Sequence, residues 1–284
     1  MHQTYVYKLY NNKRKNKYLN DKINLAGSIY NHCIALHKKF YSLYNKSLNK
    51  YKLQKHITKL KKTKRFNYWN NISIDVIQQI TDRIETAYKL FFNNLKRKRK
   101  CSPPSFKKIR KYKSITFKKS GYKFLEDNKI RIMSKTFKIF KSRTMYYNKI
   151  CTVTIKRNNI GEFFIYIVVE NDDYQNPLTR SGKSVGMDFG LKTFLTLSNN
   201  NKIESPLFFN QNINEIKKLS KQLSKKNKKS NNYKKSLIKL NRLYIDLFNK
   251  KKDYFYKLSI ELCQQFDLIA IEDLNISAMK KLWG

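Results

Sequence analysis

The chain has 284 residues, of which 62 are Lys or Arg and 19 are Asp or Glu, so its formal net charge is +43. Charge of this size repels itself unless a polyanion neutralises it, which favours nucleic acid as the partner. An AT-rich genome explains the excess of Lys, Asn, Ile and Tyr but not the scarcity of acidic residues. No apolar run approaches the ~20 residues that cross a bilayer, and no signal peptide opens the sequence. We therefore expect an intracellular protein that is neither secreted nor inserted in a membrane.

The cysteines predict free thiols in a reducing compartment, because they are dispersed and include no CxxC pair. Four are present: Cys33, Cys101, Cys151 and Cys263. Without paired cysteines the chain cannot form a zinc ribbon, so we expect no zinc in it. His32, Cys33 and His37 fall on one predicted helix, but a fourth ligand is missing there as well.

The N-terminal part reads as one strand followed by helices. Residues 4–9 alternate as a strand does, and residues 23–44 carry apolar side chains at helical spacing. Residues 51–68 are ambiguous, and a solvated helix is the simplest interpretation. Ser73 is a suitable N-cap for a clearer helix, whose apolar stripe covers residues 76–91. We expect the acidic residues of that helix either to face solvent or to pair with lysines, and not to be catalytic: Asp75, Asp82 and Glu85.

A basic run with two prolines, residues 95–111, ends the helical part, because proline cannot continue a helix. Beyond it the period changes to two, and glycine and Asn or Asp pairs mark the turns. The predicted strands cover residues 115–117, 129–133, 137–140, 151–156 and 163–169. Five short antiparallel strands predict a small β-barrel, with residues 4–9 as a candidate sixth strand. Residues 171–183 read as a linker.

Residues 185–198, VGMDFGLKTFLTLS, predict a strand, a tight turn and a second strand, with Asp188 at the end of the first. Gly186 and Gly190 leave room for the close approach of another backbone, a metal ion or a phosphate. A carboxylate at this position can also simply cap a turn.

Residues 268–274, LIAIEDL, predict a second buried strand, and this one ends in Glu272 and Asp273. Carboxylates at two strand ends in so basic a protein suggest a site where a divalent metal ion meets nucleic acid. The alternative for Glu272 is a charge at the N-terminus of a following helix.

Residues 212–266, between the two strand ends, predict a long and strongly basic helical hairpin with its bend at 225–232, KKNKKSNN. Hardly any acidic residue is near enough in sequence to pair with its lysines, so phosphate binding is favoured over a merely solvated surface. The candidate nucleic-acid-binding residues are Lys217, Lys218, Lys221, Lys225, Lys226, Lys228, Lys229, Lys234 and Lys235.

Strand, turn, strand, long helix and strand is the opening order of the ribonuclease H-like fold, in which neighbouring strands supply carboxylates. Such oxygens are hard ligands suited to Mg²⁺ or Mn²⁺. Two ions about 4 Å apart can activate water and stabilise the leaving oxygen in phosphodiester cleavage. Asp188 and Glu272 are therefore the candidate catalytic and metal-binding residues.

Residues 185–198 resemble the first RuvC motif of the TnpB (OrfB) proteins of insertion sequences, and LIAIEDLNISAM, from Leu268, resembles their second motif. The resemblance covers nearly the whole chain. Three further segments resemble the family's N-terminal segment, its recognition-lobe helix and the start of its barrel: 31–44, 81–95 and 103–117. The basic hairpin resembles the bridging helix before the second motif. The Fanzor proteins and the type V CRISPR effectors are similar but more distant.

The resemblance implies an α/β multi-domain fold. Its parts would be a first barrel strand at 1–10, a helical recognition lobe at 11–111, a small antiparallel β-barrel at 112–180, and an incomplete RuvC, ribonuclease H-like domain at 181–284 that includes the basic helical hairpin 212–266. It also implies an RNA-guided DNA endonuclease encoded by a transposable element, with guide RNA and DNA as partners. Mg²⁺ or Mn²⁺ would bind Asp188 and Glu272, while Asp273 would be structural.

Family members continue past the second motif into further helices, a zinc ribbon and a third catalytic Asp, which this sequence lacks before its last residue, Gly284. Loss of one metal ligand commonly costs orders of magnitude in rate. We therefore expect a truncated copy that is inactive alone and needs a complementing C-terminal fragment or a full-length copy. The alternatives are a non-catalytic RNA- or DNA-binding regulator and a decaying remnant. Under each of these interpretations we expect the protein inside the cell where the element's DNA lies: the cytoplasm or nucleoid of a bacterium, a nucleus or a viral factory.

Overall fold

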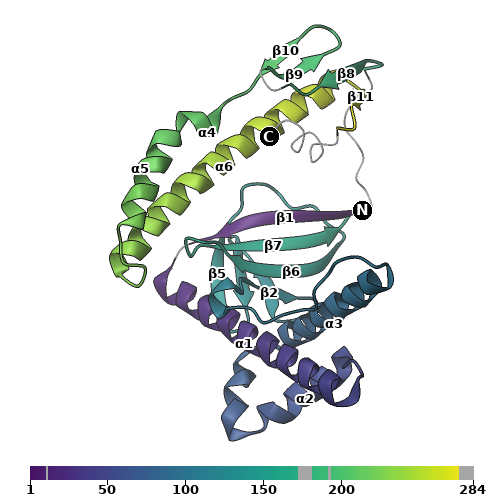
Figure 1. Ribbon diagram of the computed structural model, residues 1–284, viewed down its shortest axis with the longest axis vertical. Coiled ribbons are helices and arrows are strands. Elements are labelled where there is room, and N and C mark those ends of the chain that lie inside the picture. The colour runs from purple at the N-terminus through teal and green to yellow at the C-terminus, as the bar shows by residue number, and fades with distance from the viewer. Residues whose placement is uncertain (11, 172–180, 191–192, 275–284) are drawn as a thin grey trace. The chain divides into compact units, whose positions relative to one another are not determined.

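The computed structural model describes residues 1–10, 12–171, 181–190 and 193–274. The chain divides into two compact units, Met1–Tyr174 and Gln175–Gly284, and each is described by itself. Figure 1 shows the elements of both.

The first unit combines helices with strands. Its elements in chain order are β1 (His2–Leu9), α1 (Lys13–Tyr44), α2 (Lys50–Lys61), the 3₁₀ helix η1 (Lys64–Asn71), α3 (Ile74–Lys96), the 3₁₀ turn η2 (Ile109–Lys111), β2 (Ser114–Phe117), β3 (Tyr122–Leu125), β4 (Lys129–Ile132), β5 (Lys135–Phe140), β6 (Lys149–Arg157) and β7 (Phe163–Glu170). The helices expected at 23–44 and 76–91 are confirmed. The ambiguous segment 51–68 becomes α2 and most of η1, so the helical interpretation holds there too.

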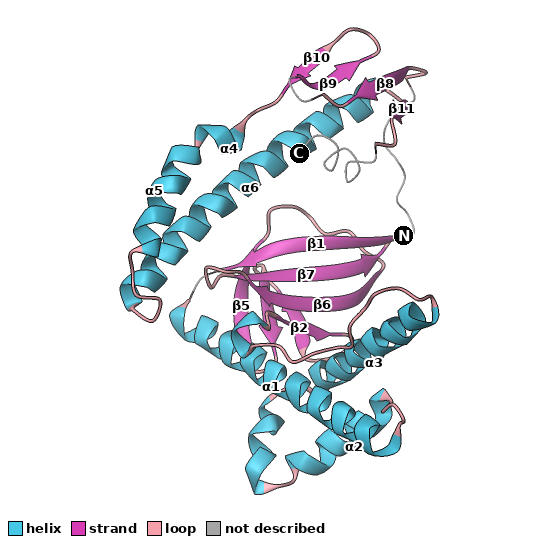
Figure 2. Cartoon of the chain, in the orientation of Figure 1, coloured by secondary structure: helices cyan, strands magenta, loops and turns pink. Residues whose placement is uncertain are grey.

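The strands of this unit form one antiparallel sheet in the order β2-β6-β7-β1-β5-β4-β3. It is strongly curved and nearly closed, with β2 and β3 as its two ends (Figure 2). The candidate sixth strand therefore does join the barrel: β1 lies in the middle of the sheet, paired along its length with β7 from His2↔Glu170 to Lys8↔Phe164. The strand β3 was not predicted, because four residues of mixed burial give too short a pattern.

The core of the unit lies between the sheet and the helices. Leu19, Ile23 and Ile34 of α1 are completely buried, and Ile115 and Phe117 of β2 join them from the sheet. Each such side chain contributes about 1.5–3 kcal/mol through the apolar area that it removes from water. The apolar stripes predicted from periodicity are therefore what holds the helices on the sheet.

Arg157, the last residue of β6, fastens the sheet to α1. Its guanidinium donates hydrogen bonds to the side-chain oxygens of Asn20 and Asn24, at 2.8 and 2.9 Å. It also donates to the carbonyls of Ile109 and Tyr112, at 3.1 and 2.8 Å. The planar guanidinium of Arg157 thus donates to four neutral acceptors on two other segments of the chain. Burial lowers the pKa of Arg157 from its ordinary value.

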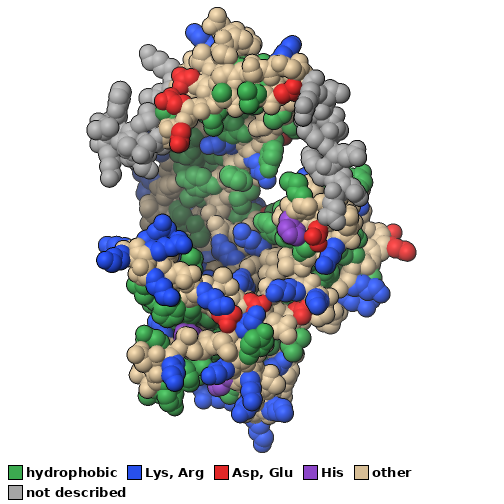
Figure 3. All heavy atoms as spheres, turned by 90° about the vertical axis from the view of Figure 1, so that its right-hand side faces the viewer, with side chains coloured by type: hydrophobic (Ala, Val, Ile, Leu, Met, Phe, Trp, Pro, Cys, Tyr) green, Lys and Arg blue, Asp and Glu red, His purple; other side chains and the backbone are tan. Residues whose placement is uncertain are grey.

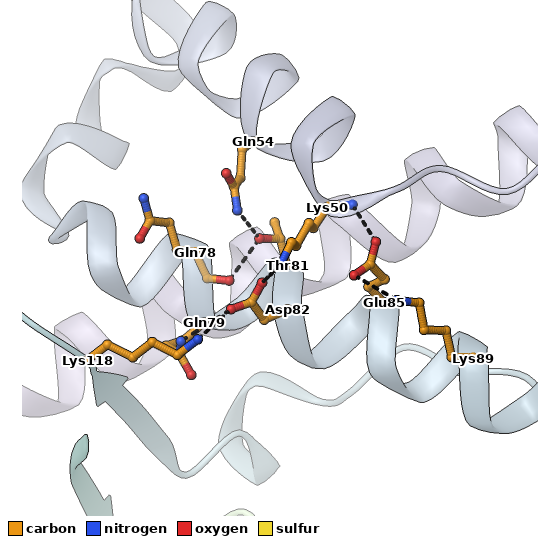
Figure 4. A network of polar contacts seen from close by, with 9 residues as sticks. All are labelled: Lys50, Gln54, Gln78, Gln79, Thr81, Asp82, Glu85, Lys89 and Lys118. Atoms are coloured by element: carbon orange, nitrogen blue, oxygen red, sulfur yellow. Dashed lines mark hydrogen bonds and ion pairs between the residues drawn. The ribbon is translucent and has the colours of Figure 1, made fainter. Parts of the chain in front are cut away.

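Two of the three acidic residues of α3, Asp82 and Glu85, pair with lysines as expected (Figure 4). The third, Asp75, is buried and accepts hydrogen bonds from the backbone N–H and the hydroxyl of Ser120, at 2.5 and 2.9 Å. Asp82 forms ion pairs with Lys50 of α2, at 3.2 Å, and with Lys118, at 3.1 Å. Glu85 pairs with Lys89 at 3.4 Å and accepts a hydrogen bond from the backbone of Lys50 at 3.3 Å. Although burial acts to raise the pKa of Asp82, the hydrogen bonds from its two lysines hold it below the ordinary value.

The second unit contains β8 (Ser184–Asp188), β9 (Thr193–Leu197), β10 (Lys202–Glu204), α4 (Phe208–Gln211), α5 (Ile213–Ser224), α6 (Asn231–Gln265) and β11 (Leu268–Ile271). Its sheet has the order β10-β9-β8-β11, in which β8, β9 and β10 run antiparallel and β11 runs parallel to β8. The predicted hairpin is confirmed, since α5 ends before the expected bend at 225–232 and α6 begins within it. The three-residue strand β10 was not predicted.

The buried centre of this unit is small. Leu262 of α6 packs on Val185 of β8 and Leu197 of β9, so the C-terminal part of α6 covers one face of the sheet. The expectation that 268–274 is a buried strand was wrong, because Leu268 and Ile271 are 64% and 61% exposed. Among the described strands only β8 pairs with β11, which leaves β11 at an edge of the sheet.

Candidate functional site

Asp188 and Glu272 lie at the same edge of the second sheet. The parallel pairing of β8 with β11 runs from Ser184↔Leu268 to Met187↔Ile271, and Asp188 and Glu272 are the next residue on each chain. Paired positions of parallel strands direct their side chains to the same face. Both residues are exposed, so both carboxylates are accessible from solvent. The fold thus places these two residues at the same end of neighbouring strands, although they are far apart in sequence.

Asp267 stabilises this register, a role that no pattern in the sequence predicts. Its carboxylate accepts hydrogen bonds from the backbone N–H groups of Ser181, at 3.0 Å, and Gly182, at 2.7 Å. Its own N–H donates to the carbonyl of Lys183 at 2.9 Å. The start of β11 is therefore tied to the start of β8, which aligns their far ends. An Asp before an apolar run is too common to predict a partner 85 residues away.

The two glycines near Asp188, Gly186 and Gly190, differ in whether their position has room for a side chain. A Cβ on Gly190 would lie 2.6 Å from the carbonyl oxygen of Thr193, so the backbone approaches too closely for any side chain. A Cβ on Gly186 would meet nothing nearer than the Ser198 side chain at 3.7 Å, an ordinary contact. The expected close approach is therefore confirmed for another backbone segment at Gly190 and is not required at Gly186.

Two consecutive acidic residues, Glu272 and Asp273, directly follow β11. Asp273 is exposed like Glu272, and the N–H of Leu274 donates to the carbonyl of Glu272 at 3.1 Å, which begins a turn. Within the described parts of the chain, no group of three or more His, Cys, Asp or Glu side chains is arranged to hold a metal ion. Asp188 and Glu272 nevertheless supply the hard oxygen donors that Mg²⁺ and Mn²⁺ prefer.

The lysines of the hairpin form an exposed basic surface on α5, α6 and the bend between them. Eight of the nine predicted lysines are exposed, and the ninth, Lys226, is half-buried and donates to the hydroxyl of Ser236. No carboxylate of the described residues is within ion-pair distance of any of the nine. On the face of the molecule drawn in Figure 3, Lys and Arg side chains likewise outnumber Asp and Glu, which occur only in small groups.

The structure does not bring His32, Cys33 and His37 together. Nε2 of His32 lies 3.1 Å from Nε2 of His56 in α2, and Cys33 is buried in the core. The ring of His37 stacks on Tyr88 with centroids 3.7 Å apart. Burial lowers the pKa of both His32 and His37, and it raises the pKa of Cys33 to about 12.

Several known proteins are similar to this chain in sequence. Residues 166–282 match the family model OrfB_IS605, a probable transposase. The chain is 28% identical over 205 residues to a putative RNA-guided DNA endonuclease, InsQ, of Escherichia coli (strain K12), covering 72% of this chain and 49% of that protein. It is 26% identical over 230 residues to a putative RNA-guided DNA endonuclease of Streptomyces pristinaespiralis, covering 79% and 55%. The TnpB-like protein L79 of Acanthamoeba polyphaga mimivirus is 34% identical over 110 residues, covering 36% and 21%. The chain is similar to proteins of the TnpB family.

The chain spans about half the length of the two bacterial relatives. A solved complex of Cas12f1 with sgRNA and target DNA aligns over 99% of this chain and 75% of its own, at 13% identity. Its TM-score is 0.38, which is too low to support an inference. None of the described helices combines the length and the apolar character that crossing a membrane requires.

Proposed function

We propose that the second unit is part of a RuvC, ribonuclease H-like nuclease domain, and that the chain binds guide RNA and DNA as its relatives' names suggest. The observation that carries the proposal is the parallel pairing of β8 with β11, since Asp188 and Glu272 directly follow its last pair, Met187↔Ile271. The antiparallel order of β8, β9 and β10, followed by a long helix and a parallel strand, also supports it.

Asp188 and Glu272 would hold Mg²⁺ or Mn²⁺ at the strand edge. Ions bound there would activate water and stabilise the leaving oxygen during phosphodiester cleavage. Asp267 acts through the backbone, since its hydrogen bonds set the register that brings the two carboxylates level. The lysines of the α5–α6 hairpin would hold phosphates by charge, which binds a strand without reading its sequence.

The first test is Mn²⁺ binding by titration calorimetry. We expect Asp188→Asn and Glu272→Gln each to abolish binding, because each removes a negative oxygen ligand. Asp273→Asn is the matched control, one residue away and equally exposed, and should bind as the parent does. Equal loss in all three variants, or retention in Asp188→Asn, would contradict the assignment.

The second test is magnesium-dependent cleavage of plasmid DNA by the chain purified with its bound RNA. We expect cleavage that depends on Mg²⁺ and is lost in Asp188→Ala, because that variant removes one of the two carboxylates proposed to hold the ion. Cleavage that persists in Asp188→Ala would contradict the nuclease assignment.

A non-catalytic regulator is the second candidate, and the exposed lysine surface favours it because that surface needs no metal ion. One defined RNA retained at moderate salt, with no cleavage under any of these conditions, would support this candidate over the nuclease.

A further inference from the structure

Helices α1 and α3 of the first unit enclose a cavity of about 300 Å³ that the proposed nuclease chemistry does not use. Its floor is aromatic and well ordered by packing: His37 and Tyr88 stack with ring centroids 3.7 Å apart, and Tyr88 stacks on Phe92 at 6.4 Å. His37 and Tyr88 are 1% and 8% exposed, so most of the cavity surface that a ligand could touch belongs to the other lining residues, which include the aromatic rings of Tyr41, Phe91 and Phe92. Tyr41 and Leu95 line the rim and are 45% and 48% exposed.

The rim of this aromatic cavity is strongly basic. Lys38 of α1 lines it directly. The segment 96–100, KRKRK, is exposed at every position and begins directly after Leu95. The chain then returns to the cavity, because Pro103 is again a lining residue. Among the described residues no carboxylate forms an ion pair with this segment.

A turn and one contact keep the basic segment close to the cavity. Lys98 has a left-handed backbone with φ of 53°, which turns the chain at the end of α3. Cys101 then lies with its sulfur 3.7 Å from the carbonyl of Phe91, a residue of the cavity wall. The fold therefore holds the basic segment 96–100 beside the aromatic cavity.

We propose that this cavity receives one unpaired nucleobase of a nucleic-acid strand whose phosphates contact Lys38 and residues 96–100. A nucleotide matches both halves of the site: a flat ring with apolar faces suits the aromatic floor, and its phosphates suit the cationic rim. Stacking on aromatic rings tolerates any base, so the site needs no hydrogen-bonding code. The proposal goes beyond the nuclease site, because it concerns different residues in the other unit.

The test compares fluorescein-labelled single-stranded oligonucleotides with abasic oligomers of the same length, bound to the full chain and followed by fluorescence anisotropy at moderate salt. Phosphate contacts alone would bind both equally. Base stacking should make the base-carrying strand bind about five- to a hundred-fold tighter. Oligodeoxythymidine and oligouridine are used in parallel, since DNA and RNA offer the same chemistry and the tighter of the two identifies the source.

Two variants locate the effect. Tyr41→Ala removes an exposed wall of the cavity, and Leu95→Trp fills the cavity from its exposed rim, so neither disturbs the core. Both should reduce the preference for bases to within about twofold of parity. Tyr44→Ala is the control, because it removes an exposed aromatic ring of the same helix that does not line the cavity, and it should keep the preference. Equal binding of abasic and base-carrying strands by the parent, or a preference that survives in both cavity variants, would overturn the proposal.

Discussion

At the scale of single residues, Arg157 shows how one side chain can connect distant segments. Arg157→Lys should lower the free energy of unfolding by about 1–3 kcal/mol, because an ammonium keeps the charge but cannot reach four acceptors at once. Urea unfolding followed by tryptophan fluorescence measures this, with Trp69 buried in the same unit. Arg97→Lys, at an exposed position, should change stability by less than about 0.5 kcal/mol. Equal effects of the two variants would contradict the role of Arg157.

The cysteines offer a second prediction at this scale, since thiolates and not thiols react with disulfide reagents. Cys33 is 1% exposed and burial raises its pKa to about 12, whereas Cys263 is exposed. Labelling of the folded chain near pH 8, located by peptide mass spectrometry, should modify Cys263 first and leave Cys33 unmodified until urea unfolds the chain. Early modification of Cys33 would mean that the α1 core opens readily.

At the scale of elements, the packing of α1 on α2 should depend on pH. Burial, with the neighbouring charges second, lowers the pKa of His32 and His56 below the ordinary value of 6.5. As pH falls below about 6.5 the unfolded chain takes up protons first, so stability is fully present above that pH and declines below it. Asp82 acts in the same direction, but its effect begins only below its own ordinary value of 3.8.

Urea unfolding at pH 7.5 and pH 5.0 tests this dependence, and we expect a lower midpoint at pH 5.0. His56→Gln should weaken the dependence, because it removes one titrating member of the pair that lies 3.1 Å apart. His2→Gln, at an exposed position, is the control and should leave the dependence unchanged. A midpoint that is independent of pH between these values would contradict the prediction.

The pairing of β8 with β11 is the other element that can be tested directly. Asp267→Ala removes both hydrogen bonds to the Ser181–Gly182 backbone and should speed amide hydrogen exchange in β11. Asp267→Ala should also weaken Mn²⁺ binding, because the β8–β11 register would no longer keep Asp188 and Glu272 side by side. Faster exchange with unchanged Mn²⁺ binding would mean that the carboxylates do not depend on this register.

At the scale of the whole molecule, the net charge of +43 governs association. Binding to single-stranded nucleic acid should weaken steeply with salt, because each phosphate contact releases a counterion. Replacing Lys228 and Lys229 of the hairpin by Gln should reduce the slope of log affinity against log salt by about 0.7 per lost contact. The same change at Lys123 and Lys135, exposed on the first sheet, is the comparison and should reduce it less.

Local signals in the sequence predicted the parts whose pattern is long. The apolar spacing of α1, α3 and α6 and the alternation of β6 and β7 are repeated over several turns or residue pairs, so their positions were correct. The motif residues Asp188 and Glu272 also lie at the strand ends where they were expected. The strands β3 and β10, of four and three residues, were not predicted.

The tertiary structure alone decided which of these parts meet. Arg157 binds Asn20 across 137 residues, and Asp267 binds Gly182 across 85, and no local pattern specifies either contact. The aromatic cavity likewise exists only because α1 and α3 pack together, with Tyr41 and Leu95 at its rim. The sequence by itself determined the charge, the helices, most strands and the family motifs, since these depend on composition and neighbouring residues. Strand registers, hydrogen bonds between distant residues and cavities depend on long-range packing, which only the folded chain defines.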